Sequence, residues 1–155
     1  MTEHLADIAE RLDSAQASAT AVPQLETPLN LDDAYAVQRL SLARRYQRGE
    51  RRVGIKMGFT SRAKMAQMGI DEMIWGRLTD AMQVEDGGEV GHARFVHPRV
   101  EPELAFLLGE APDGGPITSI NIAACVVAVA PGCQHQADPA FTIPDRAYAW
   151  TAICW

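Results

Sequence analysis

Two glutamates spaced two residues apart are the first feature of this sequence that could support chemistry. Glu101 and Glu103 lie in the stretch 97–108, and the two-residue period of a β-strand would place both carboxylates on one face. Pro102 between them cannot donate a ladder hydrogen bond, which predicts an edge position or a break in pairing. Adjacent carboxylates raise one pKa unless a cation neutralises them, and a hard divalent ion with oxygen ligands is the simplest such cation. The alternative is an exposed edge strand with two solvated glutamates.

A lysine inside an apolar strand is the second such feature. Lys56 lies in the predicted strand 52–57, flanked by Gly54 and Gly58, which allow another backbone to approach closely. A lysine in these surroundings must be paired with an acid or have a lowered pKa. It would then position a substrate carboxylate or take part in proton transfer. The alternative is an edge lysine whose ammonium group reaches into solvent.

Three further residues are candidates for binding an anion. Thr60 and Ser61 follow a strand and a glycine and open a predicted helix, where backbone N–H groups and a hydroxyl attract negative charge. Ordinary helix capping is the alternative. Arg99 shares the face of Glu101 and is expected to pair with it or to bind a substrate carboxylate. The four histidines have no metal-site spacing, and the Cys-x-His motif at 133–135 is too short to form a zinc site alone.

Length, charge and cysteine content exclude several classes of protein. The 155 residues suffice for one domain with its own core, and the net charge of −6 argues against nucleic-acid binding. The N-terminus lacks the basic and apolar blocks of an export signal, and no apolar run is long enough to span a membrane. Cys125, Cys133 and Cys154 form no CxxC pair, which predicts free thiols in a reducing, cytoplasmic compartment.

Two helices are predicted in the first 50 residues. The first has an apolar stripe at the helical period and ends near Ser18. The second begins after Asn30, carries acids in its first turn and ends at Gly49. The stripe of the first helix is Leu5, Ile8, Ala9, Leu12 and Ala15, and that of the second is Ala34, Val37 and Leu40. The arginines near the end of the second helix are interpreted as its solvated end: Arg44, Arg45, Arg48, Arg51 and Arg52.

Short strands and helices are predicted for the rest of the chain. Strands are expected at 52–57, 74–78, 82–84 and 97–108, with a turn at 85–88. Helices are expected after Thr60 or Ser61, closed by Gly69, and at 120–129, ended by Pro131. The apolar end of the 97–108 strand is expected to be buried on both sides, through Val100, Leu104, Phe106 and Leu108.

The order of these elements predicts the α+β fold class. An N-terminal helical segment at 1–50 precedes a β-rich region at 51–155, and the two make one domain overall.

Three stretches carry a resemblance to a known family. They read VGIKMGFTSRAKM at 53–65, IWGRLTDAM at 74–82 and HPRVEPELAF at 97–106. In order and spacing they resemble the hydratase/decarboxylase branch of the fumarylacetoacetate hydrolase superfamily, and they are more similar to its decarboxylases than to its hydratases. The similarity runs from the second helix to about Leu108, and more faintly to Pro131.

That resemblance implies a fold, a cofactor and a reaction. The fold would be part of a mixed, mostly antiparallel β-sheet of the fumarylacetoacetate hydrolase type. Glu101 and Glu103 would hold Mg²⁺ or Mn²⁺, Lys56 would be catalytic, and Arg99, Thr60 and Ser61 would bind substrate. The reaction would be decarboxylation of 2-oxo-3-hexenedioate to 2-hydroxypenta-2,4-dienoate in aromatic meta-cleavage catabolism. Hydration of 2-oxopent-4-enoate is the alternative reaction.

The resemblance also implies partners and an incomplete site. The expected partners are a small 2-oxo acid, the hydratase of the same pathway and further copies in an oligomer, with no nucleic acid or membrane. A third carboxylate ligand is expected close to Gln134, and family members continue beyond position 155. The missing third acid and the shorter length predict a truncated chain that binds its metal ion weakly. A further alternative is an inactive homologue that acts only by association with a partner subunit.

Overall fold

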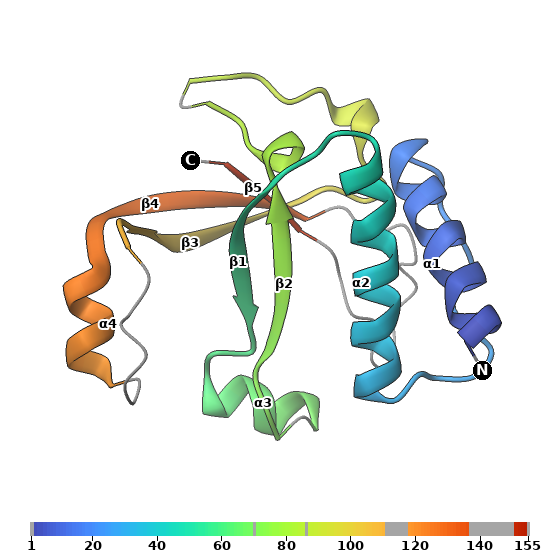
Figure 1. Ribbon diagram of the computed structural model, residues 1–155, viewed down its shortest axis with the longest axis horizontal. Coiled ribbons are helices and arrows are strands. Elements are labelled where there is room, and N and C mark those ends of the chain that lie inside the picture. The colour runs from blue at the N-terminus through green and yellow to red at the C-terminus, as the bar shows by residue number, and fades with distance from the viewer. Residues whose placement is uncertain (1, 70, 86, 111–117, 137–150, 155) are drawn as a thin grey trace.

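The chain folds into two packed helices followed by two small antiparallel β-sheets, as a computed structural model shows (Figure 1). The structure describes residues 2–69, 71–85, 87–110, 118–136 and 151–154. Its helices are α1 (Thr2–Ala17), α2 (Leu31–Gln47), α3 (Arg62–Met68) and α4 (Ser119–Cys125), with short 3₁₀ helices at Asp80–Met82 and His92–Arg94. Its strands are β1 (Arg52–Gly58), β2 (Ile74–Thr79), β3 (Arg99–Leu108), β4 (Val126–Gln136) and β5 (Thr151–Cys154). Within this described part of the chain, no helix combines the length and apolar character needed to cross a membrane.

Helices α1 and α2 pack along the apolar stripe that the sequence predicts. Ile8 and Ala9 of α1 bury themselves against Val37 of α2, and the neighbouring leucines cover this cluster. The prediction that Leu40 belongs to the stripe is wrong, since it is 37% exposed, whereas Leu42 is 2% exposed. The buried surface of α2 is broader than one stripe because the helix contacts α1 on one side and strand β2 on another.

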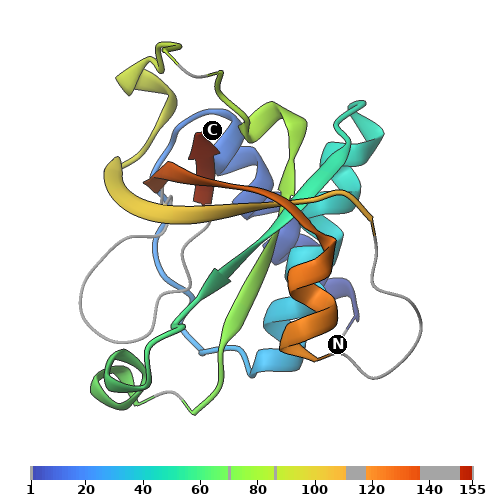
Figure 2. The ribbon, with the colours of Figure 1, turned by 90° about the vertical axis from the view of Figure 1, so that its left-hand side faces the viewer.

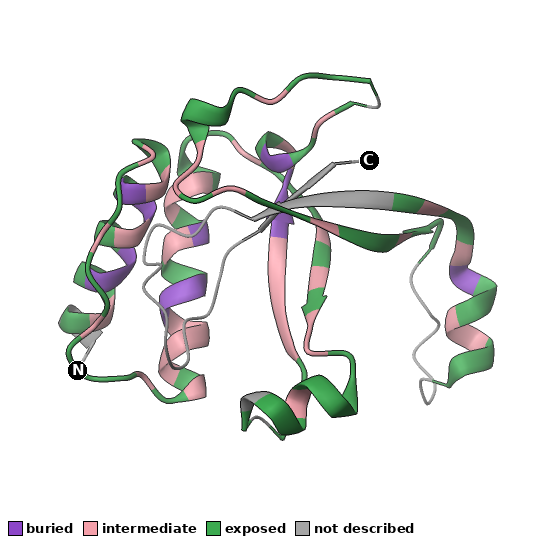
Figure 3. Cartoon of the chain, turned by 180° about the vertical axis from the view of Figure 1, so that it is seen from behind, coloured by how far each residue is buried: buried purple, intermediate pink, exposed green. Residues whose placement is uncertain are grey.

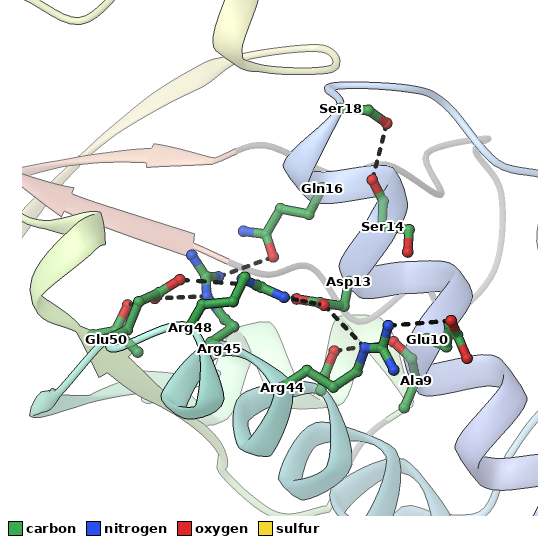
Figure 4. A network of polar contacts seen from close by, with 12 residues as sticks. Ala9, Glu10, Asp13, Ser14, Gln16, Ser18, Arg44, Arg45, Arg48 and Glu50 are labelled. Carbon is green, nitrogen blue, oxygen red and sulfur yellow. Dashed lines mark hydrogen bonds and ion pairs between the residues drawn. The ribbon is translucent and has the colours of Figure 1, made fainter.

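Arginines at the end of α2 bind acids instead of facing only solvent, so the interpretation of the cluster as a solvated end is wrong for Arg44, Arg45 and Arg48, while Arg51 and Arg52 are exposed. Asp13 of α1, whose side chain is 3% exposed, accepts two hydrogen bonds from Arg48 at 2.7 and 2.8 Å and a third from Arg44 at 3.2 Å (Figure 4). Arg45 donates to Glu50 at 2.8 Å and to Gln16. These charge-assisted hydrogen bonds attach the first helix to the second.

Side chains of α2 cover the open edge of strand β2. The phenol oxygen of Tyr35 accepts a hydrogen bond from the Trp75 N–H at 3.2 Å, and Gln38 Nε2 donates to the Trp75 carbonyl at 3.1 Å. The rings of Tyr35 and Trp75 stack with centroids 5.0 Å apart, and the Arg77 guanidinium lies over the indole. At Trp75 the backbone polar groups of this edge are therefore satisfied by side chains and are not available to another strand.

Strand β3 is the edge of a three-stranded sheet in the order β3-β4-β5, which confirms the edge position predicted from Pro102. Strands β3 and β4 cross the β1–β2 pair, as two views at right angles show (Figures 1 and 2). This crossing brings β1 and β3, which are 40 residues apart in sequence, to one place.

Two predicted elements are wrong in kind. The expected helix at 120–129 ends at Cys125, and the chain continues as strand β4 through Pro131. The β-branched run from Val126 pairs with β3, so tertiary pairing overrides the local helical pattern. The expected strand at 82–84 is not formed: Met82 ends the 3₁₀ helix Asp80–Met82, Gln83 is irregular and Val84 makes only a single β-bridge. The turn expected at 85–88 is present as a hydrogen bond from the Gly88 N–H to the Glu85 carbonyl.

The apolar end of β3 is exposed, contrary to the prediction that it is buried on both sides (Figure 3). Leu104 is 69% and Phe106 57% exposed, and on β4 Val127 and Val129 are 64% and 57% exposed. Val100 and Leu108 are also exposed. The even-numbered residues of β3 share the face opposite Glu101 and Glu103, and β4 is the main packing neighbour of β3 in the described part of the chain. We call Leu104, Phe106, Leu108 and Val129 the apolar face of the β3–β4 pair, since Val129 pairs with Phe106 and the three residues of β3 alternate onto one face.

Replacement of Asp13 by Asn tests the ionic attachment of α1. We expect the free energy of unfolding to fall by about 2 kcal/mol, because the amide cannot satisfy two guanidinium groups at a buried position. Glu10→Gln is the control, since its 63% exposed side chain pairs with Arg44 in solvent and its loss should change stability by less than about 0.5 kcal/mol.

The ion pairs of Asp13 also make the free energy of unfolding depend on pH. Burial raises the pKa of Asp13, but the hydrogen bonds and charges of Arg48 and Arg44 outweigh burial and hold the pKa below its ordinary value of 3.8. The stabilisation is therefore present above this value and is lost as the pH falls through the folded-state pKa. Urea unfolding at several pH values should show this loss in the wild type and not in Asp13→Asn; equal pH profiles would contradict the assignment.

Candidate functional site

The predicted lysine and glutamates meet where β1 and β3 cross. Lys56 Nζ lies 3.7 Å from Glu103 Oε1. The Lys56 side chain is 18% exposed and that of Glu103 is 44% exposed, so the ammonium group is largely covered while the carboxylate remains half in water. An alternating strand pattern on β3 places Glu101 on the same face as Glu103. The structure therefore brings together three of the residues that the sequence singled out.

Burial is the main influence on the charge of Lys56. Desolvation lowers the pKa of its ammonium group below the ordinary value, and the negative charges of Glu103 and Glu101 oppose this shift without cancelling it. The sequence predicted either an acidic partner or a lowered pKa, and both are present. An amine in this state can release or accept a proton more readily than a solvated lysine.

Glycines surround Lys56 on its own face of the β1–β2 pair. Gly76 of β2 is the direct cross-strand neighbour of Lys56, and Gly54 and Gly58 lie two residues to either side on β1. A Cβ atom built on Gly76 meets no atom within 4 Å among the described residues. Open space therefore lies beside the stem of the lysine, on the side of the pair from which Glu103 approaches.

Sequence reasoning did not single out Gly76. Its significance depends on the register between β1 and β2, which pairs it with Lys56, and no local pattern in the sequence shows that register. Glycine within a strand does, however, signal close approach or open space, and that signal is present in the sequence.

The remaining predicted site residues lie outside this contact. Thr60 and Ser61 are exposed between β1 and α3, and Ser61 caps α3 through its backbone conformation without a side-chain hydrogen bond to the helix. Arg99 is exposed at the first position of β3, two residues before Glu101. A role for these three residues in binding substrate stays a prediction.

Position 134, close to which the resemblance places a third acid, lies in strand β4. Gln134 is the cross-strand neighbour of Glu101 in the register of β3 and β4. The register thus places the backbone of position 134 beside that of Glu101. In the described residues, no group of three or more histidine, cysteine, aspartate or glutamate side chains is arranged to hold a metal ion.

The two glutamates nevertheless suit one class of ion. Mg²⁺ is commonly held by one or two carboxylates, with water and substrate oxygens completing its shell. Glu101 and Glu103 supply two oxygen ligands from one strand face, and the open space above Gly76 leaves room for the remaining ligands. The residues present therefore fit a hard divalent ion that also binds its substrate.

A cavity of about 430 Å³ lies elsewhere, between the ends of α1 and α2 and the segment 81–96. Its wall includes Asp13, Arg45, Arg48 and Glu50, whose charges are already paired with one another. None of Lys56, Glu101 and Glu103 lines this cavity. We assign the cavity no part in the chemistry of the crossing.

Comparison with known proteins gives several close relatives. The chain is 50% identical over 144 residues to a 4-oxalocrotonate decarboxylase of Pseudomonas sp., a match that covers 89% of this chain and 56% of the relative. It is 38% identical over 117 residues to a 4-oxalocrotonate decarboxylase of Pseudomonas putida, covering 74% and 44% of the two chains. It is 33% identical over 150 residues to the 2-oxo-hept-4-ene-1,7-dioate hydratase of Escherichia coli, covering 91% and 56%. No protein-family model matches the chain.

Solved structures agree with these sequence matches. The structure is similar to 4-oxalocrotonate decarboxylase from Pseudomonas putida G7 complexed with magnesium and adipate, with a TM-score of 0.82 and 32% identity. The match covers 90% of this chain and 54% of that chain. This chain thus spans about half the length of the relatives that it matches.

Replacement of Glu103 by Gln tests the contact at the crossing. We expect the pKa of Lys56 to fall further, because the variant keeps the burial and removes the largest opposing charge. Titration of the Lys56 ε-carbon resonance by NMR would measure the shift. Glu110→Gln, in an exposed position beyond the end of β3, is the control and should leave the midpoint unchanged. An unchanged midpoint in Glu103→Gln would show that the two side chains do not meet.

Proposed function

The chain is a relative of the 4-oxalocrotonate decarboxylases over about half of their length, and we propose that it is a metal-dependent lyase of this type. The proposed reaction is decarboxylation of 2-oxo-3-hexenedioate (4-oxalocrotonate) to 2-hydroxypenta-2,4-dienoate, in a cytoplasmic catabolic pathway. The observation that carries the proposal is the partly buried Lys56 ammonium group beside Glu103 and Glu101. We further propose that the whole fold is of the fumarylacetoacetate hydrolase type, which the match to the decarboxylase structure supports.

Glu101 and Glu103 would hold a Mg²⁺ or Mn²⁺ ion. When bound, the ion supplies Lewis-acid polarisation of the 2-oxo group of the substrate. The relative from Pseudomonas putida G7 was solved with magnesium, which supports the choice of ion. Two protein carboxylates should hold it less tightly than three, since each lost carboxylate removes an oxygen ligand and a negative charge.

In the proposed reaction an electron pair moves from the bond that breaks to the 2-oxo oxygen of the substrate, while residues of this chain bind the substrate and supply a proton. The bond between C5 and C6 breaks and CO₂ leaves. Its electron pair forms a C4–C5 double bond, shifts the existing double bond to C2–C3 and ends on the 2-oxo oxygen. Lys56 would stabilise that oxygen by its charge and donate the proton that gives the 2-hydroxy product, and its lowered pKa favours the donation. Arg99, with Thr60 and Ser61, would bind a substrate carboxylate.

Binding of Mn²⁺ and adipate, followed by product analysis, tests this proposal. We expect Glu101→Gln and Glu103→Gln each to weaken Mn²⁺ binding, measured by electron paramagnetic resonance, by roughly tenfold or more, while Glu110→Gln has no effect. Adipate should bind more tightly when Mn²⁺ is present. With 2-oxo-3-hexenedioate we expect CO₂ release, slower than that of a full-length relative because the third acid expected close to position 134 is absent.

Two outcomes would contradict the proposal. Mn²⁺ binding that both glutamine variants leave unchanged would remove the metal site from β3. Conversion of 2-hydroxypenta-2,4-dienoate to a 4-hydroxy-2-oxo acid, without CO₂ release from the dicarboxylate, would assign the chain to the hydratases that are among its relatives.

A second function is favoured by the apolar face of the β3–β4 pair. Four large apolar side chains on adjacent strands are each more than half exposed, which is unusual for a monomeric soluble protein. The chain would then act as a subunit that packs on a full-length homologue or on the pathway hydratase.

Co-elution with the Pseudomonas sp. relative tests this second function. On size-exclusion chromatography we expect a complex that the double variant Leu104→Glu, Phe106→Glu abolishes, because the introduced charges would be buried without partners. Leu40→Glu, on the exposed side of α2, is the control and should co-elute. A monomeric chain that neither aggregates nor binds the relative would exclude the subunit role.

A further inference from the structure

We infer that Gly76 forms the floor of the substrate site and restricts that site to extended, unbranched acids. The inference rests on the proposed function, because it names the residue that makes room for the substrate beside Lys56. It concerns a position with no side chain, which contacts the substrate through its backbone.

The register of β1 and β2 places this floor. Lys56 and Gly76 are direct cross-strand neighbours, so the missing Cβ of Gly76 would lie about 5 Å from that of Lys56 on the same face. The other positions of that face close the space at its two ends. A Cβ on Gly54 would lie 3.5 Å from Leu78 Cδ1, and one on Gly58 would lie 3.0 Å from Ile74 Cγ1. At Gly76 alone of these three glycines, no described atom lies within 4 Å of the added carbon.

Neither the backbone nor the packing of the described residues requires glycine at this position. The glycines with positive φ are Gly49, Gly69 and Gly87, so Gly76 has a conformation that other residues adopt freely. Glycine in a strand interior lowers stability, and a β-branched residue would raise it. The remaining use for a glycine here is the space that its side chain leaves next to Lys56.

The surroundings of this space define its ligand. The backbone of β2 is its floor, the Lys56 ammonium group is on one side, and Glu103 and Glu101 approach from β3. Ile74 and Leu78 limit its length along the strand. An unbranched acid, either conjugated and planar or fully extended as adipate can be, can lie against the flat peptide backbone with an oxygen at the ammonium group, whereas a branched chain would need more height.

Substitution of Gly76 distinguishes an effect on the space for the substrate from an effect on metal binding. In Gly76→Val we expect adipate affinity in the presence of Mn²⁺ to fall at least tenfold, and in Gly76→Ala to fall by less. The binding of Mn²⁺ alone should not change, because Glu101 and Glu103 are intact. The thermal midpoint should stay equal or rise. Gly91→Val is the matched control, since Gly91 also has open space around its added carbon and a φ of −65° but lies far from Lys56 in sequence and outside both sheets.

Each outcome decides the inference. If the wild type binds Mn²⁺ and adipate and Gly76→Val binds both equally well, Gly76 is not the floor, and the proposed function stands. If the wild type binds neither Mn²⁺ nor adipate, the proposed function and this inference both fail. If Gly76→Val does not fold, Gly76→Ala gives the same comparison, and adipate binding equal to that of the wild type would overturn the inference.

Discussion

The contact of the partly buried Lys56 ammonium group with Glu103 is the interaction that links the two sheets where β1 and β3 cross. Lys56 loses hydration where β3 crosses β1, and this loss favours its neutral form. Glu103 and Glu101 restore part of the stability of the charged form, and the lysine in turn reduces the repulsion between the two acids. In the described part of the chain, this contact and those of β5 with β2 join a two-stranded and a three-stranded sheet that share no hydrogen-bonded ladder.

The N-terminal helices stabilise this arrangement from the far edge of β2. Tyr35 and Gln38 bond both backbone polar groups of Trp75, which a neighbouring strand would otherwise satisfy. The helix that carries them is itself held to α1 through Asp13. The NH₂ group of the Gln38 side chain donates to β2. The carbonyl oxygen of the same side chain is buried without a hydrogen-bond partner among the described residues.

The two glutamates of the candidate site and the exposed apolar side chains lie on opposite faces of strand β3. The odd-numbered face carries Glu101 and Glu103 toward Lys56, and the even-numbered face carries Leu104 and Phe106 into solvent. A substrate and a partner chain would therefore approach from opposite sides of the same strand. Because side chains alternate along a strand, the same alternation places the acids on one face and the apolar side chains on the other. A shift of one residue in the register would therefore exchange the two faces.

The sequence by itself determined the local elements and the chemistry of the candidate residues. Asn30 and Gly49 mark the ends of α2, Gly69 closes α3 in a left-handed conformation, and Glu101 and Glu103 share a strand face, because each of these depends only on near neighbours. The tertiary structure alone decided that Val126 begins a strand, that Asp13 binds the arginines of α2, and that Gly76 lies beside Lys56. These depend on pairing between segments distant in the chain, where the free energy of forming a ladder or burying a charge exceeds local propensity.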